Sequence, residues 1–403
     1  MFKPFLPYKT VLLILTFVIV LGGMIACESN NKTSTPNKKE KKAFDNISLL
    51  APLPLNIPVP EDNPQSPEKI NLGKLLFYDP ILSGNKDIAC ASCHHPDFNF
   101  SDGQEISIGT NARGLGSKRQ FNIPNDIPFV KRNSQTILNT AFNGITNNEM
   151  PDPKNAVMFW DSRVRSLEKQ SLEPIKALEE MRGRAYTEED ALKNVIERLK
   201  KITTYQTLFK KAFEQEDPIT IDNLGKAIAS YERTLISNNS RFDQYLRGDK
   251  KAISGFELDG LKAFLRSGCT QCHNGPMLSD FKMHSLGVPD NEKLGFSDSG
   301  ANNQYTFRTA SLRNLAYTQP FMHSGKFGTL ERVLEFYEDL AGRKIANKKV
   351  PDNFIDPLVK NLNVDFKDIS LIVAFLNTLN DPNFDKSIPA SVPSGLKVGG
   401  EIK

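Results

Sequence analysis

The sequence predicts a mainly helical protein with two domains and long loops. Several segments repeat apolar side chains at the spacing of an α-helix, and no long segment alternates apolar and polar residues as a half-buried strand does. A Cys-x-x-Cys-His motif occurs once in each half of the chain. The length of 403 residues suits two domains of moderate size.

Two helices are predicted from the residues that begin them. In the segment 66–77, Ser66 can cap a helix and Pro67 takes the first helical position. In the segment 187–201, Thr187 and Asp190 stand at the spacing of a capping box.

Three further helices are predicted from the apolar residues that they align. Along 221–236, one face carries Leu224, Ala227, Ile228, Tyr231 and Leu235. Along 329–340, which Thr329 can cap, one face carries Leu330, Val333, Leu334 and Tyr337. The segment 369–379 is more apolar than the others, so its helix is expected to be more buried.

Loops rich in proline, glycine and asparagine separate these helices. The longest cover 99–132, 143–156 and 285–305, and long loops are usually functional. A boundary is predicted near 247, because the resulting domains, 48–246 and 247–403, then hold one Cys-x-x-Cys-His motif each.

An export signal is predicted at residues 1–26. Two lysines flank its start, and the apolar run 10–26 is short for a membrane span, which needs about 20 residues. The stretch GMIAC, which ends at Cys27, resembles a bacterial lipobox, in which the cysteine is lipidated. The alternative is an uncleaved anchor helix. Both interpretations place the rest of the chain outside the cytoplasm.

The charge pattern argues against nucleic acid as a partner. The net charge is only +4, whereas a nucleic-acid binder usually has a dense basic face. The basic run 32–42 lies within a predicted polar linker, residues 27–47, where solvation is its simplest role.

The two Cys-x-x-Cys-His motifs are the attachment signal of c-type haem. On a helical turn, residues i, i+3 and i+4 share a face, so two thiols can bond one porphyrin while the imidazole reaches its iron. The two sets are Cys90, Cys93 and His94, and Cys269, Cys272 and His273.

A zinc site or a redox dithiol would also use Cys-x-x-Cys pairs. However, a zinc site made of both pairs would need no histidine after each, and redox dithiols are more often found in a βαβ context. The sequence therefore predicts two covalently bound haems. A simple electron carrier would need fewer residues around each haem, which points to a built active site.

Four stretches of the chain resemble the bacterial dihaem cytochrome c peroxidase/MauG family. They are residues 72–103, 132–143, 159–175 and 307–337, and the resemblance extends over about 50–380. It implies a mainly helical fold of two cytochrome-c-like haem domains with long loops, and a calcium ion between them.

The resemblance also implies roles for individual residues. The haem of the first motif would react with peroxide, and the haem of the second would receive electrons. Trp160, the only tryptophan, matches the residue between the haems, while Gln170 and Glu180 match the peroxide-pocket glutamine and the acid–base glutamate. The residues that match the calcium ligands are Asn133, Thr318 and Pro320.

The sequence departs from most of the family in its distal haem ligands. No histidine occurs between His95 and His273, so the usual second ligand of the peroxidatic iron is absent. At the distal position of the second haem stands Tyr337, as in the MauG type. The alternatives are Met277, Met283 and Met322. His284 and His323 are expected to be structural, for example as contacts of haem propionates.

Together with the lipobox-like stretch at Cys27, the resemblance predicts a periplasmic peroxidase that is held to the membrane through the lipidated Cys27. It would reduce hydrogen peroxide to water with electrons from a small cytochrome c or another donor. Two alternatives remain open at this stage. One is a MauG-like enzyme that oxidises residues of a partner protein, and the other is a dihaem electron carrier without peroxide chemistry.

Overall fold

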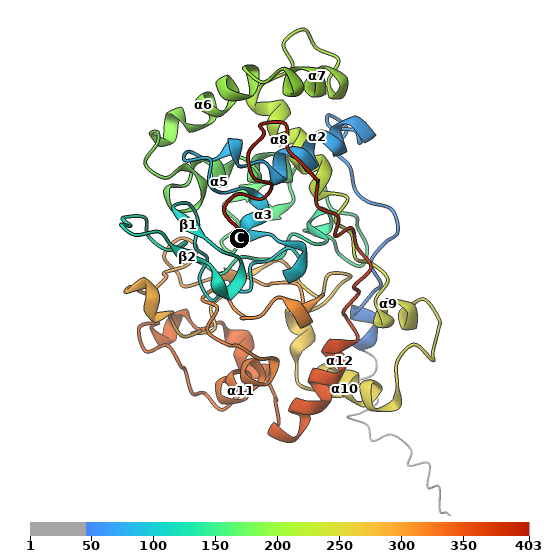
Figure 1. Cartoon of the computed structure of the whole chain (residues 1–403). Helices are drawn as coiled ribbons and strands as arrows, with labels where there is room; N and C mark the ends of the chain where they lie inside the picture. The colour runs from blue at the N-terminus through green and yellow to red at the C-terminus, as the bar shows by residue number, and fades with distance from the viewer. Residues whose placement is uncertain (1–45, 403) are drawn as a thin grey trace, which may run out of the picture. The chain divides into compact units, whose positions relative to one another are not determined.

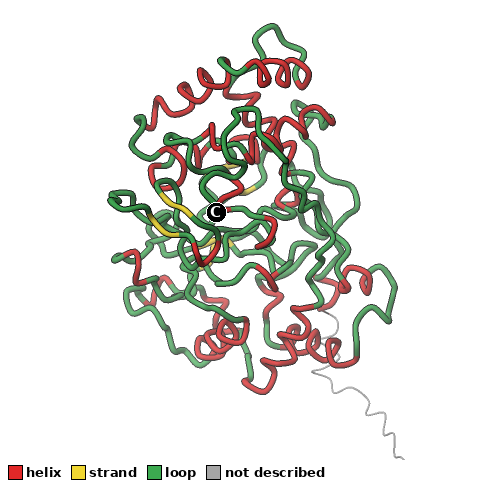
Figure 2. The backbone as a smooth tube through the Cα atoms, viewed as in Figure 1, coloured by secondary structure: helices red, strands yellow, loops and turns green. Residues whose placement is uncertain are grey.

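Helices make up nearly all of the regular structure in the computed structural model, which describes residues 46–402 (Figure 2). The α-helices are α2 (Pro67–Tyr78), α3 (Cys90–Cys93), α4 (Leu167–Gln170), α5 (Glu173–Lys176), α6 (Glu188–Lys200), α7 (Thr203–Ala212), α8 (Ile221–Glu232), α9 (Arg241–Leu246), α10 (Gly255–Arg266), α11 (Leu330–Ala341) and α12 (Ile369–Asn377). The predicted export signal, Cys27 and nearly all of the predicted linker lie outside the described residues. Within 46–402, no helix is long and apolar enough to cross a membrane.

Short helical turns occupy much of the chain between these helices. They are η1 (Asn46–Leu49), η2 (Pro80–Leu82), η3 (Pro96–Phe98), η4 (Gly116–Lys118), η5 (Thr140–Phe142), the π-type turn η6 (Leu178–Arg182), η7 (Cys269–Gln271), η8 (Glu292–Leu294), η9 (Leu315–Tyr317), η10 (Asp352–Phe354), η11 (Pro357–Asn361) and η12 (Phe366–Asp368).

The described strands are only two residues long, which confirms the expected lack of long strands. They form three antiparallel pairs: β1 (Ala112–Arg113) with β2 (Gln120–Phe121), β3 (Val157–Met158) with β4 (Val164–Arg165), and β5 (Met283–His284) with β6 (Phe307–Arg308). In the last pair, Met283 lies opposite Arg308.

The predicted helix starts are confirmed. The side chain of Ser66 accepts a hydrogen bond from the backbone N–H of Lys69, with Pro67 at the first helical position. Thr187 caps α6 in the same way, and Thr329 caps α11. These hydroxyls satisfy N–H groups that have no partner inside the helix.

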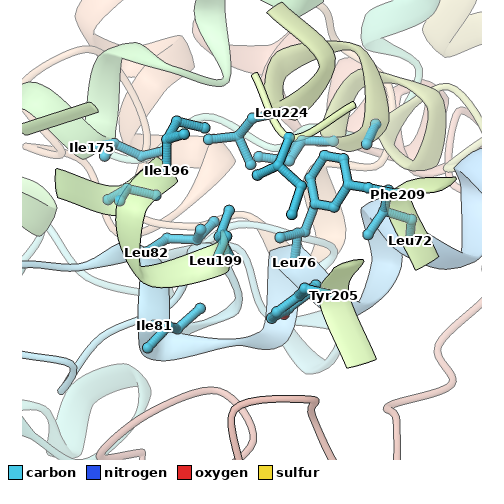
Figure 3. Close-up of a cluster of buried hydrophobic side chains, with 14 of the residues drawn as sticks. Leu72, Leu76, Ile81, Leu82, Ile175, Ile196, Leu199, Tyr205, Phe209 and Leu224 are labelled. Atoms are coloured by element: carbon cyan, nitrogen blue, oxygen red, sulfur yellow. The ribbon is translucent and has the colours of Figure 1, made fainter. Parts of the chain in front are cut away.

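The largest apolar cluster joins α2, α6, α7 and α8 (Figure 3). The face predicted along 221–236 is almost fully buried, from Leu224 to Leu235. Helices α2 and α8 cross at Gly73, where a Cβ atom would lie only 1.9 Å from the carbonyl oxygen of Ala227. Glycine therefore permits the close approach of these two helices.

A second cluster joins α10, α11 and α12 and repeats this construction. Helices α10 and α12 cross at Gly260, where a Cβ atom would lie 2.0 Å from the carbonyl oxygen of Leu371. Each crossing includes the helix that precedes one Cys-x-x-Cys-His motif: α2 precedes α3, and α10 precedes η7.

The C-terminal segment returns to the first half of the chain, as Figure 1 shows for the dark red trace beside α2 and α3. Val392 belongs to a cluster with Phe77 and Tyr78. The Ser92 hydroxyl donates to the carbonyl of Gly399 at 2.7 Å. The domain boundary near 247 stays a prediction.

A buried ion pair joins three distant segments of the chain. Arg313 donates two hydrogen bonds to the carboxylate of Asp243, at 2.8 and 2.9 Å, and both side chains are almost fully buried. The same carboxylate accepts from the backbone N–H of Leu53 at 3.0 Å. Burial by itself raises the pKa of Asp243, but Arg313 outweighs it and brings this pKa below its usual range.

Replacing Arg313 by methionine should lower the free energy of unfolding by about 3–5 kcal/mol, because it leaves a buried carboxylate without its cation. The depressed pKa of Asp243 implies that the pair stabilises the fold above the pKa of the unfolded chain and that this stabilisation is lost as the pH falls. Urea unfolding at several pH values measures both effects. Arg332→Gln, which breaks an exposed pair with Glu335, is the control and should cost less than about 1 kcal/mol; an equal loss in both variants would contradict this account.

Candidate functional site

Each Cys-x-x-Cys-His motif forms one helical turn. In the first, the N–H of His94 donates to the carbonyl of Cys90 at 2.9 Å. In the second, the N–H of His273 donates to the carbonyl of Cys269 at 2.8 Å. This turn brings both thiols and the imidazole to one side of the backbone, as the spacing predicts.

The two imidazoles are held in the same tautomer. Nδ1 of His94 lies 3.0 Å from the carbonyl oxygen of Phe100, and Nδ1 of His273 lies 3.0 Å from that of Leu278. Because a carbonyl oxygen only accepts, each Nδ1 carries the hydrogen and each Nε2 keeps its lone pair. Burial also lowers the pKa of both histidines, which favours the neutral form that binds a metal.

The motifs open into two separate cavities. The first, of about 410 Å³, is lined by Cys90, Cys93 and His94. The second, of about 210 Å³, is lined by Cys269, Cys272 and His273. The four thiols therefore do not converge on one ion, which argues against the zinc alternative. None of the four cysteines forms a disulfide, so all four thiols are available to bond a c-type haem.

A thin wall separates the two cavities. Seven residues line both cavities: Trp160, Arg308, Ala310, Ser311, Leu315, Phe321 and Met322. The indole N–H of Trp160 donates to the carbonyl of Asn133 at 2.9 Å. The Trp160 ring lies edge-on to His323, with 6.3 Å between ring centroids, and His323 stacks on Phe307. Trp160 thus lies where an aromatic group between two haems would have to lie.

Glu180 and Gln170 both line the first cavity, together with His94. Gln170 ends α4, and Glu180 lies in the π-type turn η6. Burial, reinforced by the charge of Glu179, raises the pKa of Glu180 to about 7. This carboxyl group can therefore both accept and release a proton near neutral pH.

The three residues that match calcium ligands line the first cavity as well: Asn133, Thr318 and Pro320. The Asn133 side chain donates to the carbonyl of Gln104 at 2.7 Å, which leaves its oxygen directed elsewhere. Within residues 46–402, no hydrogen bond is accepted by this oxygen or by the carbonyls of Thr318 and Pro320. Free oxygen atoms of this kind suit a hard cation.

The candidate distal ligands divide between the cavities. Tyr337 and Met322 line the second cavity, as do the other members of the face predicted on α11. Met277 lines only the first cavity, and Met283 lines neither. Burial raises the pKa of Tyr337 well above its usual range.

The remaining histidines lie away from the first cavity. His284 bridges Asp356, at 2.6 Å, and Asp280, at 3.1 Å. Asp280 first, then the thiol of Cys272 and then Asp356 raise the pKa of His284 to about 11. Burial lowers the pKa of His323 to about 3. Both line the second cavity, whereas His95 lines neither.

Several buried ionisable residues of the cavities, among them Glu232 and Arg308, were missed by the sequence analysis. Glu232 lines the first cavity, one of its carboxylate oxygens has no hydrogen-bond partner within 46–402, and burial raises its pKa to about 8. Arg308 lines both cavities and is buried. Glu232 belongs to none of the stretches singled out above, and Arg308 lies in the stretch 307–337 but was assigned no role there. The packing of distant segments reveals both residues.

A helical chain with two separate Cys-x-x-Cys-His cavities is a c-type haem protein with places for two haems. The family profile of di-haem cytochrome c peroxidases matches residues 67–251. The chain belongs to this family.

Its relatives in the family cover most of the chain. It is 34% identical to cytochrome-c peroxidase IdrP1 of Pseudomonas sp. strain SCT, over 82% of this chain and 85% of the relative. It is 34% identical to cytochrome c551 peroxidase of Nitrosomonas europaea, over 84% and 87%. It is 33% identical to the methylamine utilization protein MauG of Methylorubrum extorquens, over 79% and 83%.

Solved structures agree with this assignment. A MauG-like protein associated with microbial copper homeostasis is 28% identical, with a TM-score of 0.64 over 82% of this chain and 95% of that one. The diheme peroxidase BthA of Burkholderia thailandensis, 22% identical, has a TM-score of 0.60 over 83% and 91%, and so supports the fold alone.

The purified protein should hold two haems that survive denaturation, because each motif presents two thiols to one cavity. Replacing Cys90 and Cys93 by alanine should remove one haem, and replacing Cys269 and Cys272 should remove the other. Pyridine haemochrome spectra after acid–acetone extraction count the haem that stays bound. If this solvent extracts all haem from the unaltered protein, the attachment is not covalent.

Proposed function

We propose that this protein is a peroxidase that reduces hydrogen peroxide to water with electrons from a small cytochrome c or a similar donor. The observation that carries the proposal is the first cavity, which is lined by both the imidazole of His94 and the titratable carboxyl group of Glu180. The family membership supports the same reaction. A reduced cytochrome mixed with the protein and peroxide should be oxidised catalytically.

Reduction of one peroxide molecule consumes two electrons and two protons and releases two molecules of water. When bound, the two haems supply the iron at which the O–O bond is reduced and the store for the electrons. Glu180 accepts a proton from the inner oxygen of the peroxide and returns it to the outer oxygen, which then leaves as water. Gln170 orients the peroxide by hydrogen bonds, since its amide has no titratable proton.

We further propose that the iron held by His94 has no second protein ligand. His94 is the only histidine that lines the first cavity, although all five histidines lie within the described residues. The place of a distal ligand would then be free for peroxide. A second candidate function is the oxidation of residues of a partner protein. The relatives named MauG suggest this function, and Tyr337 at the second cavity favours it. Peroxide consumption without any reduced cytochrome, but with a partner protein, would identify that function.

Trp160 is proposed to conduct electrons between the haems, and a calcium ion at Asn133, Thr318 and Pro320 to fix their arrangement. The hydrogen bond from Trp160 to the carbonyl of Asn133 supports a link between the two sites. The ion would therefore hold the segment against which the indole is fixed.

The periplasm is the proposed location, with an anchor on Cys27. This residue lies outside the described part of the chain, so the proposal rests on the apolar run and the lipobox-like stretch before it. The intact mass of the native protein tests it: a retained Met1 or an unmodified Cys27 would contradict the anchor.

Replacing Glu180 by glutamine should slow O–O cleavage by about two to four orders of magnitude, because acid–base help is lost while the size of the side chain is kept. Since the carboxylate form must accept the proton, the rate of the unaltered enzyme should rise as the pH passes the pKa of about 7, and this rise should vanish in the variant. Stopped-flow mixing with peroxide measures the rate. Gln170→Leu is the comparison and should cost less; a wild-type rate in Glu180→Gln would assign the proton transfer to another group.

Replacing Trp160 by phenylalanine should leave peroxide cleavage nearly intact and slow electron delivery between the haems. Removal of calcium with a chelator should slow the same step. Stopped-flow mixing in sequence, first with peroxide and then with reduced donor, separates the two steps. Unchanged electron delivery after verified removal of calcium would reject the site at Asn133.

In the oxidised protein, the haem of the first motif should be high-spin and that of the second low-spin. Tyr337→Phe should alter the low-spin signal in electron paramagnetic resonance if the phenolate is its distal ligand. Met322→Ala is the matched variant, because Met322 lines the same cavity. A change in Met322→Ala alone would make methionine the ligand, and two low-spin haems would show that the first iron is closed.

A further inference from the structure

Arg308 occupies the wall between the two cavities. It ends β6, only 6% of its surface is exposed, and its side chain lines both cavities. Its backbone N–H donates to the carbonyl of Trp160 at 2.6 Å, and this bond holds Arg308 beside the segment that carries Trp160.

The hydrogen-bond partners of its guanidinium group are all neutral. Nε donates to the carbonyl of Phe159 at 2.9 Å, and Nη2 donates to the side-chain oxygen of Gln135 at 3.2 Å. No ion pair within residues 46–402 includes Arg308, and Nη1 has no partner there. The acidic group that acts on it most is Asp161, which is already paired with Arg132 and Arg163.

Each of the other buried arginines within residues 46–402 has either a paired carboxylate or an acceptor for every side-chain nitrogen. Arg313 is paired with Asp243, and Arg233 with Glu168, although Nε of Arg233 has no hydrogen-bond partner. Arg119 has no carboxylate, but carbonyl oxygens accept from all three of its side-chain nitrogens, and it lines neither cavity. Arg308 therefore differs from these residues: it has no paired carboxylate, its Nη1 has no hydrogen-bond partner within residues 46–402, and it lines both cavities.

A buried guanidinium group without an anion is destabilising. Burial lowers the pKa of Arg308 to about 10, so the group still carries its charge at neutral pH. The cofactors that the two motifs attach each bring two propionate carboxylates, at the porphyrin edge opposite the vinyl groups that bond to cysteine. A carboxylate matches the fork of an arginine in both charge and geometry.

We propose that Arg308 binds a haem propionate at the wall between the cavities and thereby fastens the cofactor to the segment that carries Trp160. The inference rests on the haem content of the proposed function. The propionate can belong to the haem of either cavity, since Arg308 lines both. In either case, haem insertion neutralises the buried cation. The hydrogen bonds of Arg308 to Phe159 and Trp160 then connect the bound propionate to the segment that holds the bridging indole.

Three variants of the holoprotein test the proposal: Arg308→Gln, Arg308→Lys and the control Arg163→Gln. Arg163 also lines the first cavity, but its side chain is 47% exposed and is paired with Asp161. Pyridine haemochrome spectra first verify two haems per chain. Resonance Raman spectra then record the propionate-bending bands, with excitation chosen for the high-spin or the low-spin haem, and potentiometric titration gives the reduction potential of each.

Arg308→Gln should shift the propionate band of one haem and lower its reduction potential, because a cation that favours the extra electron has been removed. Arg308→Lys should shift the band less, and Arg163→Gln should leave it in place. A shifted band of the high-spin haem assigns the contact to the first cavity, and one of the low-spin haem assigns it to the second.

Unchanged propionate bands in Arg308→Gln, with both haems present, would overturn the inference and leave the proposed function intact. If that variant takes up no haem, Arg308→Lys replaces it in the test. An ammonium group cannot reproduce a forked contact, so unchanged propionate bands in Arg308→Lys would also overturn the inference. Absence of covalent haem from the unaltered protein would instead overturn the proposed function itself.

Discussion

The wall between the two cavities is the constraint on which the rest of the structure depends. It is built where β3–β4 and β5–β6 meet, and the backbone hydrogen bond from Arg308 to Trp160 joins the two. Because this wall must be thin, its few residues serve both cavities at once. The same indole that lines both sites is fixed by Asn133, so the segments around residues 133, 160 and 308 form one unit.

The two halves of the chain position their attachment turns in the same way. Each attachment turn follows a helix that crosses another helix at a glycine, and each imidazole donates from Nδ1 to a nearby carbonyl. The cavities nevertheless differ in chemistry. The first contains carboxyl groups of raised pKa, Glu180 and Glu232, while the second is lined mainly by apolar side chains. Similar scaffolds thus hold a cavity with ionisable carboxyl groups and a cavity that is mainly apolar.

Much of the fold follows from local patterns, while the cavities depend on long-range packing. Ser66, Thr187 and Thr329 predict where their helices begin, because capping and apolar periodicity act within a few residues. The haem-binding residues are equally visible, since one helical turn holds all three. Glu180 and Trp160 could be named only through the family resemblance. Arg308 could not be found from the sequence, because its lack of an anion becomes apparent only when residues 135, 159 and 161 are seen around it.

The C-terminal segment completes the surroundings of the first attachment turn. Ile88 pairs with Gly400, the N–H of Glu401 donates to the carbonyl of Asp87, and Ser92 donates to Gly399, so residues far along the chain complete the surroundings of the first turn. These contacts cannot form until that distant segment has been synthesised. The surroundings of the first pair of thiols therefore stay incomplete on this side until the end of the chain is present.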